Sequence, residues 1–102
     1  MPVKNKINSL VQDIQQKVGE FYGLKLEDFK ARKRTKAIAF PRQIAMYLCR
    51  RELKTAFQGI GQIFGRDHST VMTSIKQIEK KIAEQDKELH GILAEIEQVL
   101  MT

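Results

Sequence analysis

Apolar residues recur every three or four positions along most of this chain, which is the spacing of amphipathic helices. The first such stretch predicts a helix over residues 6–22, with Asn5 as its N-cap and Gly23 just past its end. The same spacing predicts five further helices, over residues 26–31, 39–53, 55–64, 67–84 and 86–101. We therefore expect an all-α fold of about six helices in one domain, residues 1–102, whose first turns could connect to a module upstream.

Local features refine three of these helices. Leu26 and Phe29 are three residues apart on a short helix, so both side chains are expected to enter the core. Pro41 fits the first turn of the next helix, where a missing N–H costs nothing. Thr55 and Gln58 have the spacing of a capping box, which predicts that a helix starts at Thr55.

Residues 55–84 contain two predicted helices separated by a short polar turn. Gly65 ends the first helix, and Asp67 is a residue type that commonly caps a helix start. One face of the second helix is apolar, with Val71, Ile75, Ile78 and Ile82. The opposite face carries hydroxyl and ammonium groups, on Ser69, Thr73, Lys76 and Lys80. This pattern predicts a helix-turn-helix whose second helix presents hydrogen-bonding groups to the major groove of DNA.

Positive charge is concentrated in the middle of the sequence. The formal net charge is +6, and residues 30–81 hold thirteen Lys or Arg against three Asp or Glu. Five of these cations form a basic loop, with Lys30, Arg32, Lys33, Arg34 and Lys36. A focused basic field usually faces nucleic acid or an anionic membrane surface, and a solvated surface without a partner is the alternative. For the basic loop we favour an arm that holds a phosphate or enters the minor groove.

Several functional classes find no support in the sequence. Cys49 is the one cysteine, so no intrachain disulfide is possible, which fits a reducing cytosol, and its apolar surroundings indicate a packing role. No second His or Cys stands at ligand spacing from His68, so we expect neither a metal site nor a catalytic base. No phosphate-loop motif occurs, so we expect no ATP binding by this chain, no cofactor and no enzymatic activity. No apolar run has the length of a membrane span, and no secretory signal opens the chain.

Two candidate site positions have two interpretations each. Asp67 either caps its helix alone or also accepts a hydrogen bond from a cytosine amino group. Arg42 and Gln43 lie near the predicted start of their helix, where exposed N–H groups would help them to hold a phosphate, but both could be ordinary surface residues. The acidic segment over residues 82–102 would be repelled by DNA, so we expect the last helix to lie on the far side.

The segment 65–71 reads Gly-Arg-Asp-His-Ser-Thr-Val and resembles a signature of the bacterial chromosomal replication initiators, the DnaA family. In the C-terminal DNA-binding domain of that family the signature usually reads Gly-Gly-Arg-Asp-His-Thr-Thr-Val. The similarity extends over about residues 8–100. It includes Lys33-Arg34 of the basic loop and Pro41-Arg42-Gln43 in the helix that follows.

The resemblance implies a Trp-repressor-like helical domain that binds a short asymmetric box in double-stranded DNA at the replication origin. It implies that Arg34 reads the minor groove and that Asp67, His68 and Ser69 read bases in the major groove. The resemblance, the basic loop and the polar helix face together predict a set of residues that contact the DNA backbone or support the base contacts. These residues are Lys33, Lys36, Arg42, Gln43, Arg50, Phe57, Arg66, Thr70, Thr73 and Lys76. We further expect a monomer in the absence of DNA and a cytoplasmic, nucleoid-associated location.

Three departures from the family pattern bear on DNA sequence preference. One glycine of the usual pair before Arg66 is missing, so the turn is one residue shorter and could tilt the second helix. Ser69 replaces the usual Thr, and Phe57-Gln58 replaces a common Leu-Pro, so two apolar contacts to thymine methyl groups change. These departures predict that the preferred box differs in detail from the common one.

Two alternatives to an initiator domain remain at this point. One is a stand-alone helix-turn-helix transcriptional regulator, and the other is a protein-interaction domain whose helix-turn-helix has drifted. The family's ATPase module lies upstream of the DNA-binding domain and is absent from this chain. The chain therefore corresponds either to the excised DNA-binding domain or to a small independent protein of the same fold.

Overall fold

The computed structural model describes the backbone of residues 3–30 and 36–100, and the side chains of residues 10–30 and 37–98. Five α-helices and one 3₁₀ helix make up this part of the chain, and no strand occurs in it. The elements are α1 (Val3–Tyr22), η1 (Leu26–Phe29), α2 (Lys36–Leu53), α3 (Phe57–Phe64), α4 (His68–Ala83) and α5 (Lys87–Leu100). The prediction of an all-α fold is confirmed.

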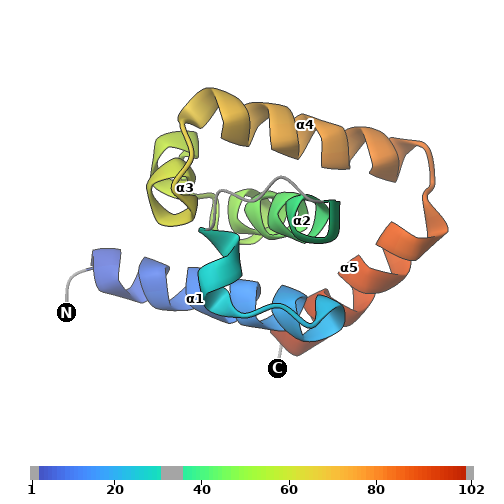
Figure 1. Ribbon diagram of the computed structural model, residues 1–102, viewed down its shortest axis with the longest axis horizontal. Coiled ribbons are helices and arrows are strands. Elements are labelled where there is room, and N and C mark those ends of the chain that lie inside the picture. Colours follow the sequence, from blue (N-terminus) through green and yellow to red (C-terminus); the bar gives the residue numbers. More distant parts are fainter. Residues whose placement is uncertain (1–2, 31–35, 101–102) are drawn as a thin grey trace.

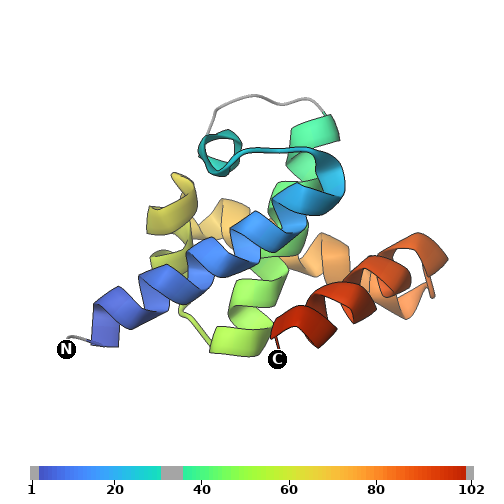
Figure 2. The same ribbon diagram turned by 90° about the horizontal axis from the view of Figure 1, so that it is seen from below.

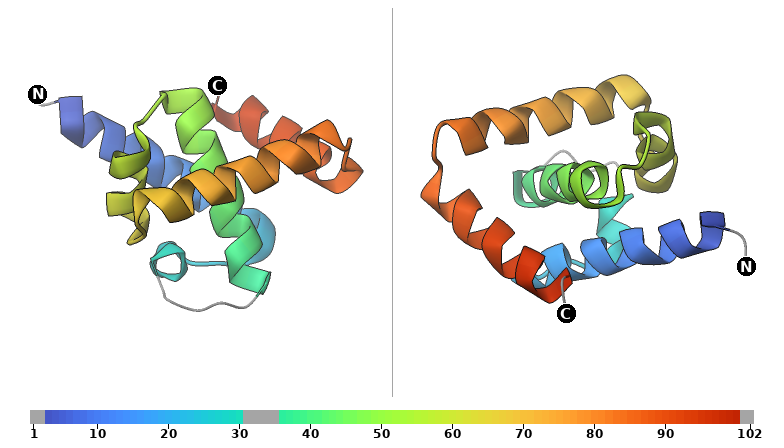
Figure 3. Two further views of the ribbon diagram at one scale, coloured as in Figure 1. Left: turned by 90° about the horizontal axis from the view of Figure 1, so that it is seen from above. Right: turned by 180° about the vertical axis from the view of Figure 1, so that it is seen from behind.

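Helix α2 is the centre of the arrangement. Figure 1 shows it nearly end-on, with α4, α3, α1 and α5 placed around it. Helices α1 and α4 cross α2 on opposite sides (Figures 2 and 3). The inward-facing residues of α2 are fully buried, namely Ile44, Ala45, Leu48 and Cys49. A helix that contacts neighbours on so many sides fixes their relative positions, including that of α4.

The core joins the apolar faces of all six elements. Helix α1 contributes Val11, Ile14 and Val18, all buried. Phe29 of η1 meets Phe64 of α3 edge to face, with ring centroids 6.3 Å apart. Leu26, in contrast, is 44% exposed, so the expectation that it enters the core is wrong. The single turn of η1 inserts only its last side chain between the neighbouring helices.

Helix α1 starts before the predicted cap. It begins at Val3, so Asn5 lies inside the helix and is not its N-cap. Val3, four residues before Ile7, extends the helical spacing upstream of Asn5, which favours continuing the helix over starting it there. At the other end Gly23 adopts a left-handed conformation with φ +69°, as predicted for the residue past the helix.

Helix α2 also starts earlier than predicted, and this changes the roles expected at its start. It begins at Lys36, so Pro41 lies inside the helix and not in its first turn. Proline cannot donate to the carbonyl four residues earlier, that of Ala37, but Ala37 is exposed and water can reach it. Arg42 and Gln43 are therefore helix-interior residues, and exposed N–H groups cannot assist them as proposed.

The predicted capping box at Thr55 and Gln58 is absent. The N-cap of α3 is Ala56, which has no side-chain acceptor. Thr55 lies one residue outside the helix, with its hydroxyl buried, and its backbone carbonyl accepts a hydrogen bond of 3.1 Å from Arg50 Nη1. Because Arg50 fixes the chain at Thr55, the helix starts too late for the threonine hydroxyl to reach the expected N–H.

Helix α5 is capped as predicted. Asp86 Oδ1 accepts a hydrogen bond of 3.0 Å from the Leu89 N–H, which is the expected N-cap contact. Arg51 of α2 forms an ion pair with Glu97 of α5. The second half of α5 lies beside α1, across α2 from α4 (Figures 1 and 2). Of the helices in the described residues, none combines the length and the apolar character needed to cross a membrane.

Candidate nucleic-acid interface

The turn between α3 and α4 is built on two glycines four residues apart. Gly65 ends α3 in the left-handed conformation, with φ 67° and ψ 37°. The Arg66 N–H then donates to the Gly61 carbonyl over 2.8 Å. A Cβ atom at position 61 would collide with the Arg66 carbonyl oxygen. Gly65 therefore allows the chain to reverse, and Gly61 allows it to pass close to the end of the helix.

The end of α1 repeats this construction. Gly23 is left-handed, and the Leu24 N–H donates to the Gly19 carbonyl over 2.9 Å. A Cβ atom at position 19 would lie 2.6 Å from the Leu24 carbonyl oxygen. The four glycines, Gly19, Gly23, Gly61 and Gly65, thus form two matching pairs that set where the chain leaves each helix.

Helix α4 starts with a side-chain cap. Asp67 has extended backbone angles, and its Oδ1 accepts a hydrogen bond of 2.8 Å from the Thr70 N–H. That hydrogen bond is the main reason why the pKa of Asp67 is lower than usual, and the charge of His68 adds to it. The capping role predicted for Asp67 is confirmed, and its carboxylate stays ionised beside the positive end of the helix.

The two faces of α4 separate as the sequence predicts. Val71, Ile75 and Ile78 are buried against the rest of the molecule. The hydroxyl and ammonium face is exposed, at Ser69, Thr73, Lys76 and Lys80. His68, in the first turn, is exposed as well. Helix α4 lies along the outside of the molecule (Figure 3), so its polar face is accessible over its whole length.

A hollow of about 300 Å³ lies between the first half of α4 and α2. Polar side chains dominate its lining, which comprises Gln43, Asp67, Ser69, Thr70, Thr73, Ser74 and Gln77. We call it the polar groove. Gln43 Nε2 donates a hydrogen bond of 2.7 Å to Gln77 Oε1 and so connects α2 to α4 across it. The fold thus gathers five of the predicted site residues in one place.

Gln77 was not among the predicted site residues. It lies four residues after Thr73 and is exposed on the same side of α4. Helical spacing from Thr73 could have identified Gln77, but its hydrogen bond to Gln43, thirty-four residues away, could not be inferred from the sequence.

Arg42 and Arg66 place two positive charges close to the turn. Arg42 is only 8% exposed, so it is not the ordinary surface residue that one of its two interpretations proposed. Burial, and then the charge of Arg66, lower the pKa of Arg42. Arg66 is half-buried and donates to the Gly65 carbonyl over 3.0 Å. The two guanidinium groups therefore lie close enough for their charges to interact.

Arg50 and Phe57 lie on the other flank of α4. The Arg50 guanidinium stacks 4.3 Å above the centre of the Phe57 ring, while also donating to the Thr55 carbonyl. Both residues line a second hollow, of about 390 Å³, with Tyr47, Arg51, Ile75 and Glu79. Arg50 and Phe57 therefore lie apart from the predicted site residues of the polar groove, and Arg50 is already engaged in holding the start of α3.

Some predicted site residues lie outside the described part of the chain, and the predictions about metal ligands and Cys49 concern described residues. Lys33 and Arg34 lie outside the described residues, and the side chain of Lys36 does as well. Among the residues that the structure does describe, no three His, Cys, Asp or Glu side chains are grouped to hold a metal ion. Cys49 is fully buried, and burial raises the pKa of its thiol to about 12, which fits the predicted packing role.

Comparison with known proteins identifies the helix-turn-helix directly. Residues 11–78 match a family model described as the helix-turn-helix of bacterial dnaA protein. A curated relative, the chromosomal replication initiator protein DnaA 2 of Protochlamydia amoebophila (strain UWE25), is 49% identical over 81 residues, which cover 79% of this chain and 18% of the relative. The chain spans less than a fifth of the length of that relative. The matched unit is a helix-turn-helix module and not a catalytic one.

Proposed function

The chain belongs to the family of DnaA C-terminal helix-turn-helix domains, and on this premise we propose that it binds a short asymmetric box in double-stranded DNA at a bacterial replication origin. In this proposal α4 enters the major groove and presents Asp67, His68 and Ser69 to base edges. The basic loop, with Arg34, occupies the adjacent minor groove.

The observation that carries this proposal is the division of α4 into a buried and an exposed face. The apolar side chains of α4 are buried in the core. The hydroxyl and ammonium groups of its other face are exposed and take no part in core packing. The Asp67 cap and the Gly61–Gly65 turn hold the start of the helix in a fixed position. A rigid, exposed, polar helix start is what base readout in the major groove requires.

Electrostatics supports a DNA backbone contact beside that helix. Arg42 and Arg66 repel each other next to the turn, and a phosphate oxygen placed near both would relieve the repulsion. The polar groove adds neutral donors at the same side of α4. Positive charge positions the domain on DNA of any sequence, while the first turn of α4 supplies the discrimination.

Fluorescence anisotropy with two labelled duplexes tests the proposal. One duplex carries the family's box, and the other is a scrambled sequence of the same composition. We expect tighter binding to the box at physiological salt, and His68→Ala should reduce the discrimination by about 1–3 kcal/mol. His90→Ala is the matched control: His90 is also exposed, lies on α5 and meets α4 at the Ile82 carbonyl, in the last turn of that helix and away from its first turn; it should leave discrimination unchanged.

The possible results separate the competing functions. Equal, salt-sensitive binding of the wild-type chain to both duplexes would mean that its target is another sequence, as for a transcriptional regulator. Absence of binding to either duplex would favour a protein-interaction domain. Unchanged discrimination in His68→Ala would contradict the assignment of α4 as the recognition helix.

Two statements about the whole protein belong to the same proposal. The chain supplies DNA contact only, and ATP-dependent steps belong to a module that lies upstream in the family. A domain bound to the chromosome would be cytoplasmic and associated with the nucleoid. Neither statement affects the duplex experiment, which uses this chain alone.

A further inference from the structure

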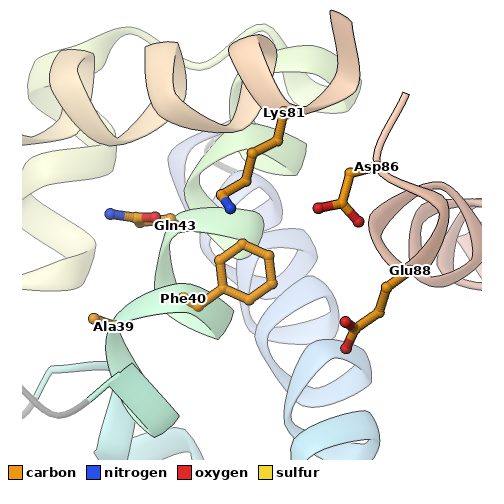
Figure 4. Close-up of a pocket in the computed structure, with 6 residues that line it drawn as sticks. All are labelled: Ala39, Phe40, Gln43, Lys81, Asp86 and Glu88. Atoms are coloured by element: carbon orange, nitrogen blue, oxygen red, sulfur yellow. The ribbon is translucent and has the colours of Figure 1, made fainter. Parts of the chain in front are cut away.

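The Gln43 side chain lines two separate hollows. On one side is the polar groove, where the start of α4 supplies hydroxyl groups and the Asp67 cap. On the other side is a hollow of about 490 Å³, lined by Ala39, Phe40, Gln43, Lys81, Asp86 and Glu88 (Figure 4). There Lys81 Nζ lies 5.3 Å from the centre of the Phe40 ring, and two carboxylates face it from the α5 side.

The direction of the Gln43 amide determines in which of the two hollows its N–H groups can donate hydrogen bonds. Figure 4 shows the amide pointing away from Phe40. The hydrogen bond to Gln77 Oε1, 2.7 Å long, holds it there. Glutamine is a long side chain with several rotamers, so an exposed amide without this bond would sample both directions. In the other direction the amide would lie in the hollow beside Phe40, Asp86 and Glu88, away from the exposed first turns of α4.

The amide pair has donors left over after the bond between its members. Each glutamine amide carries two N–H donors and one carbonyl acceptor. The bond uses one N–H of Gln43 and the carbonyl of Gln77. The second N–H of Gln43 therefore remains for another acceptor at the edge of the polar groove, and DNA offers phosphate oxygens as acceptors of this kind.

We infer that Gln77 is a positioning residue for DNA binding: by accepting the hydrogen bond from Gln43 it aims the Gln43 amide out of the polar groove toward a backbone phosphate. This inference rests on the proposed function and adds a residue to it. The contact carries no sequence information, because every base pair presents the same phosphates. Gln77 should therefore affect affinity for DNA in general and not discrimination between sequences.

A double-mutant cycle on the chain tests this role. Gln77→Met keeps the length of the side chain and removes the acceptor, and Gln43→Met removes the donor. We expect Gln77→Met to weaken binding to the box and scrambled duplexes by the same factor, about threefold to tenfold, as for one neutral hydrogen bond. In the Gln43→Met background the second substitution should have no further effect. Gln98→Met, at an exposed position on α5, is the matched control and should bind as the wild type does.

Two further readouts separate positioning from a merely structural role. Thermal unfolding of the DNA-free variants should be nearly unchanged, because Gln77 is exposed and Gln43 partly so. The side-chain amide resonances of Gln43 in a ¹H–¹⁵N spectrum should shift in Gln77→Met without DNA, since the bond exists before binding.

The outcomes are distinct from those of the duplex experiment above. If the wild type discriminates between duplexes but Gln77→Met binds equally well, the positioning role is refuted and the proposed function stands. The role is also refuted if Gln77→Met has the same effect with and without Gln43, because Gln77 would then act on DNA by itself. If the wild type binds neither duplex, both the proposed function and this inference fail.

Discussion

Asp67 shows how much one side chain contributes at the start of α4. The residue ends the turn, caps the helix through the Thr70 N–H, and adds a negative charge where the helix dipole is positive. In the proposed complex the same residue also faces bases. A capping aspartate leaves little freedom in the placement of its neighbours His68 and Ser69, which suits a precise contact.

The cap predicts a pH dependence of stability. The folded-state pKa of Asp67 is lower than the ordinary value of 3.8, chiefly because the carboxylate accepts the Thr70 hydrogen bond. A lowered pKa means that the contribution to stability is present above pH 3.8 and is lost as the pH falls through the folded-state pKa. A ¹³C NMR titration of the carboxyl group should give a value below 3.8.

Asp67→Asn provides the control for this titration. Asparagine can still accept a hydrogen bond from the Thr70 N–H but does not titrate. The decline of the melting temperature in acid should be shallower in the variant than in the wild type. An Asp67 pKa at or above the ordinary value would contradict the capping geometry.

At the scale of elements, the glycine pairs control how α3 connects to α4. After α3 the chain reverses at Gly65 and passes close to Gly61. A Cβ atom at position 61 would collide with the backbone, and a side chain at position 65 would be strained by its positive φ. The shorter turn noted in the sequence is thus closed by a backbone hydrogen bond from the Arg66 N–H to the Gly61 carbonyl.

Gly61→Ala should destabilise the domain strongly. Its methyl group would collide with the Arg66 carbonyl oxygen, and the backbone can avoid the contact only by opening the turn. We expect a loss of about 2–4 kcal/mol in the free energy of unfolding. Chemical denaturation followed by circular dichroism measures this change.

Gly91→Ala is the matched substitution for comparison. Gly91 lies in α5 and has open space where a Cβ atom would stand. Alanine is the better helix former, so this change should stabilise the domain by about 0.5–1 kcal/mol. Similar effects at both positions would mean that helix propensity, and not the close approach at the turn, governs position 61.

The sequence predicted every helix, but it predicted only some of the residues at which the helices start. Apolar periodicity identified every element, because the core needs one apolar face from each. Asp67 and Asp86 were correct caps, since each directly precedes an apolar repeat. The predicted caps at Asn5 and Thr55 were wrong. The apolar repeat continues upstream of Asn5, and Arg50 holds the chain at Thr55. Capping residues compete with tertiary contacts that local sequence does not reveal.

The candidate site was less predictable than the fold, because it depends on distances between helices. Sequence reasoning found the exposed face of α4 from its period. It could not show that Gln43 reaches Gln77, that Arg42 is buried beside Arg66, or that Arg50 and Phe57 lie on the other flank. These facts follow from how α4 crosses α2, which no local pattern specifies.

For the whole molecule, the charge of α4 differs from that of the second half of α5. Helix α4 carries three lysines against one glutamate, while the second half of α5, with Glu95 and Glu97, lies across α2 beside α1 (Figure 2). Such an asymmetric distribution orients a domain as it approaches DNA and suppresses binding through the wrong side.

Arg42→Ala tests this layout through salt dependence. If Arg42 neutralises one phosphate, the slope of the logarithm of the binding constant against the logarithm of salt concentration should become shallower by about one. Affinity for the box and scrambled duplexes should fall equally, because phosphates carry no sequence information. Anisotropy titrations at several salt concentrations measure the slope, and circular dichroism verifies that the buried position tolerates alanine.

Lys17→Ala is the corresponding control. Lys17 has the same charge but lies on α1, on the other side of α2, where it pairs with Glu20 at 3.6 Å. Its loss should leave the slope unchanged. A change in slope of equal size in both variants would indicate a general effect of net charge and would refute a specific phosphate contact by Arg42.

The paired glycine ends have a consequence for hydrogen exchange. The amides of Leu24 and Arg66 make the same bond, each to the carbonyl of a glycine five residues earlier, but one lies at the end of α1 and the other at the turn before α4. Each amide exchanges with solvent deuterium only when its own helix end opens. The molecule thus carries two chemically matched reporters of local opening, one beside the candidate interface and one away from it, and the difference between their protection factors isolates the motion of the turn itself.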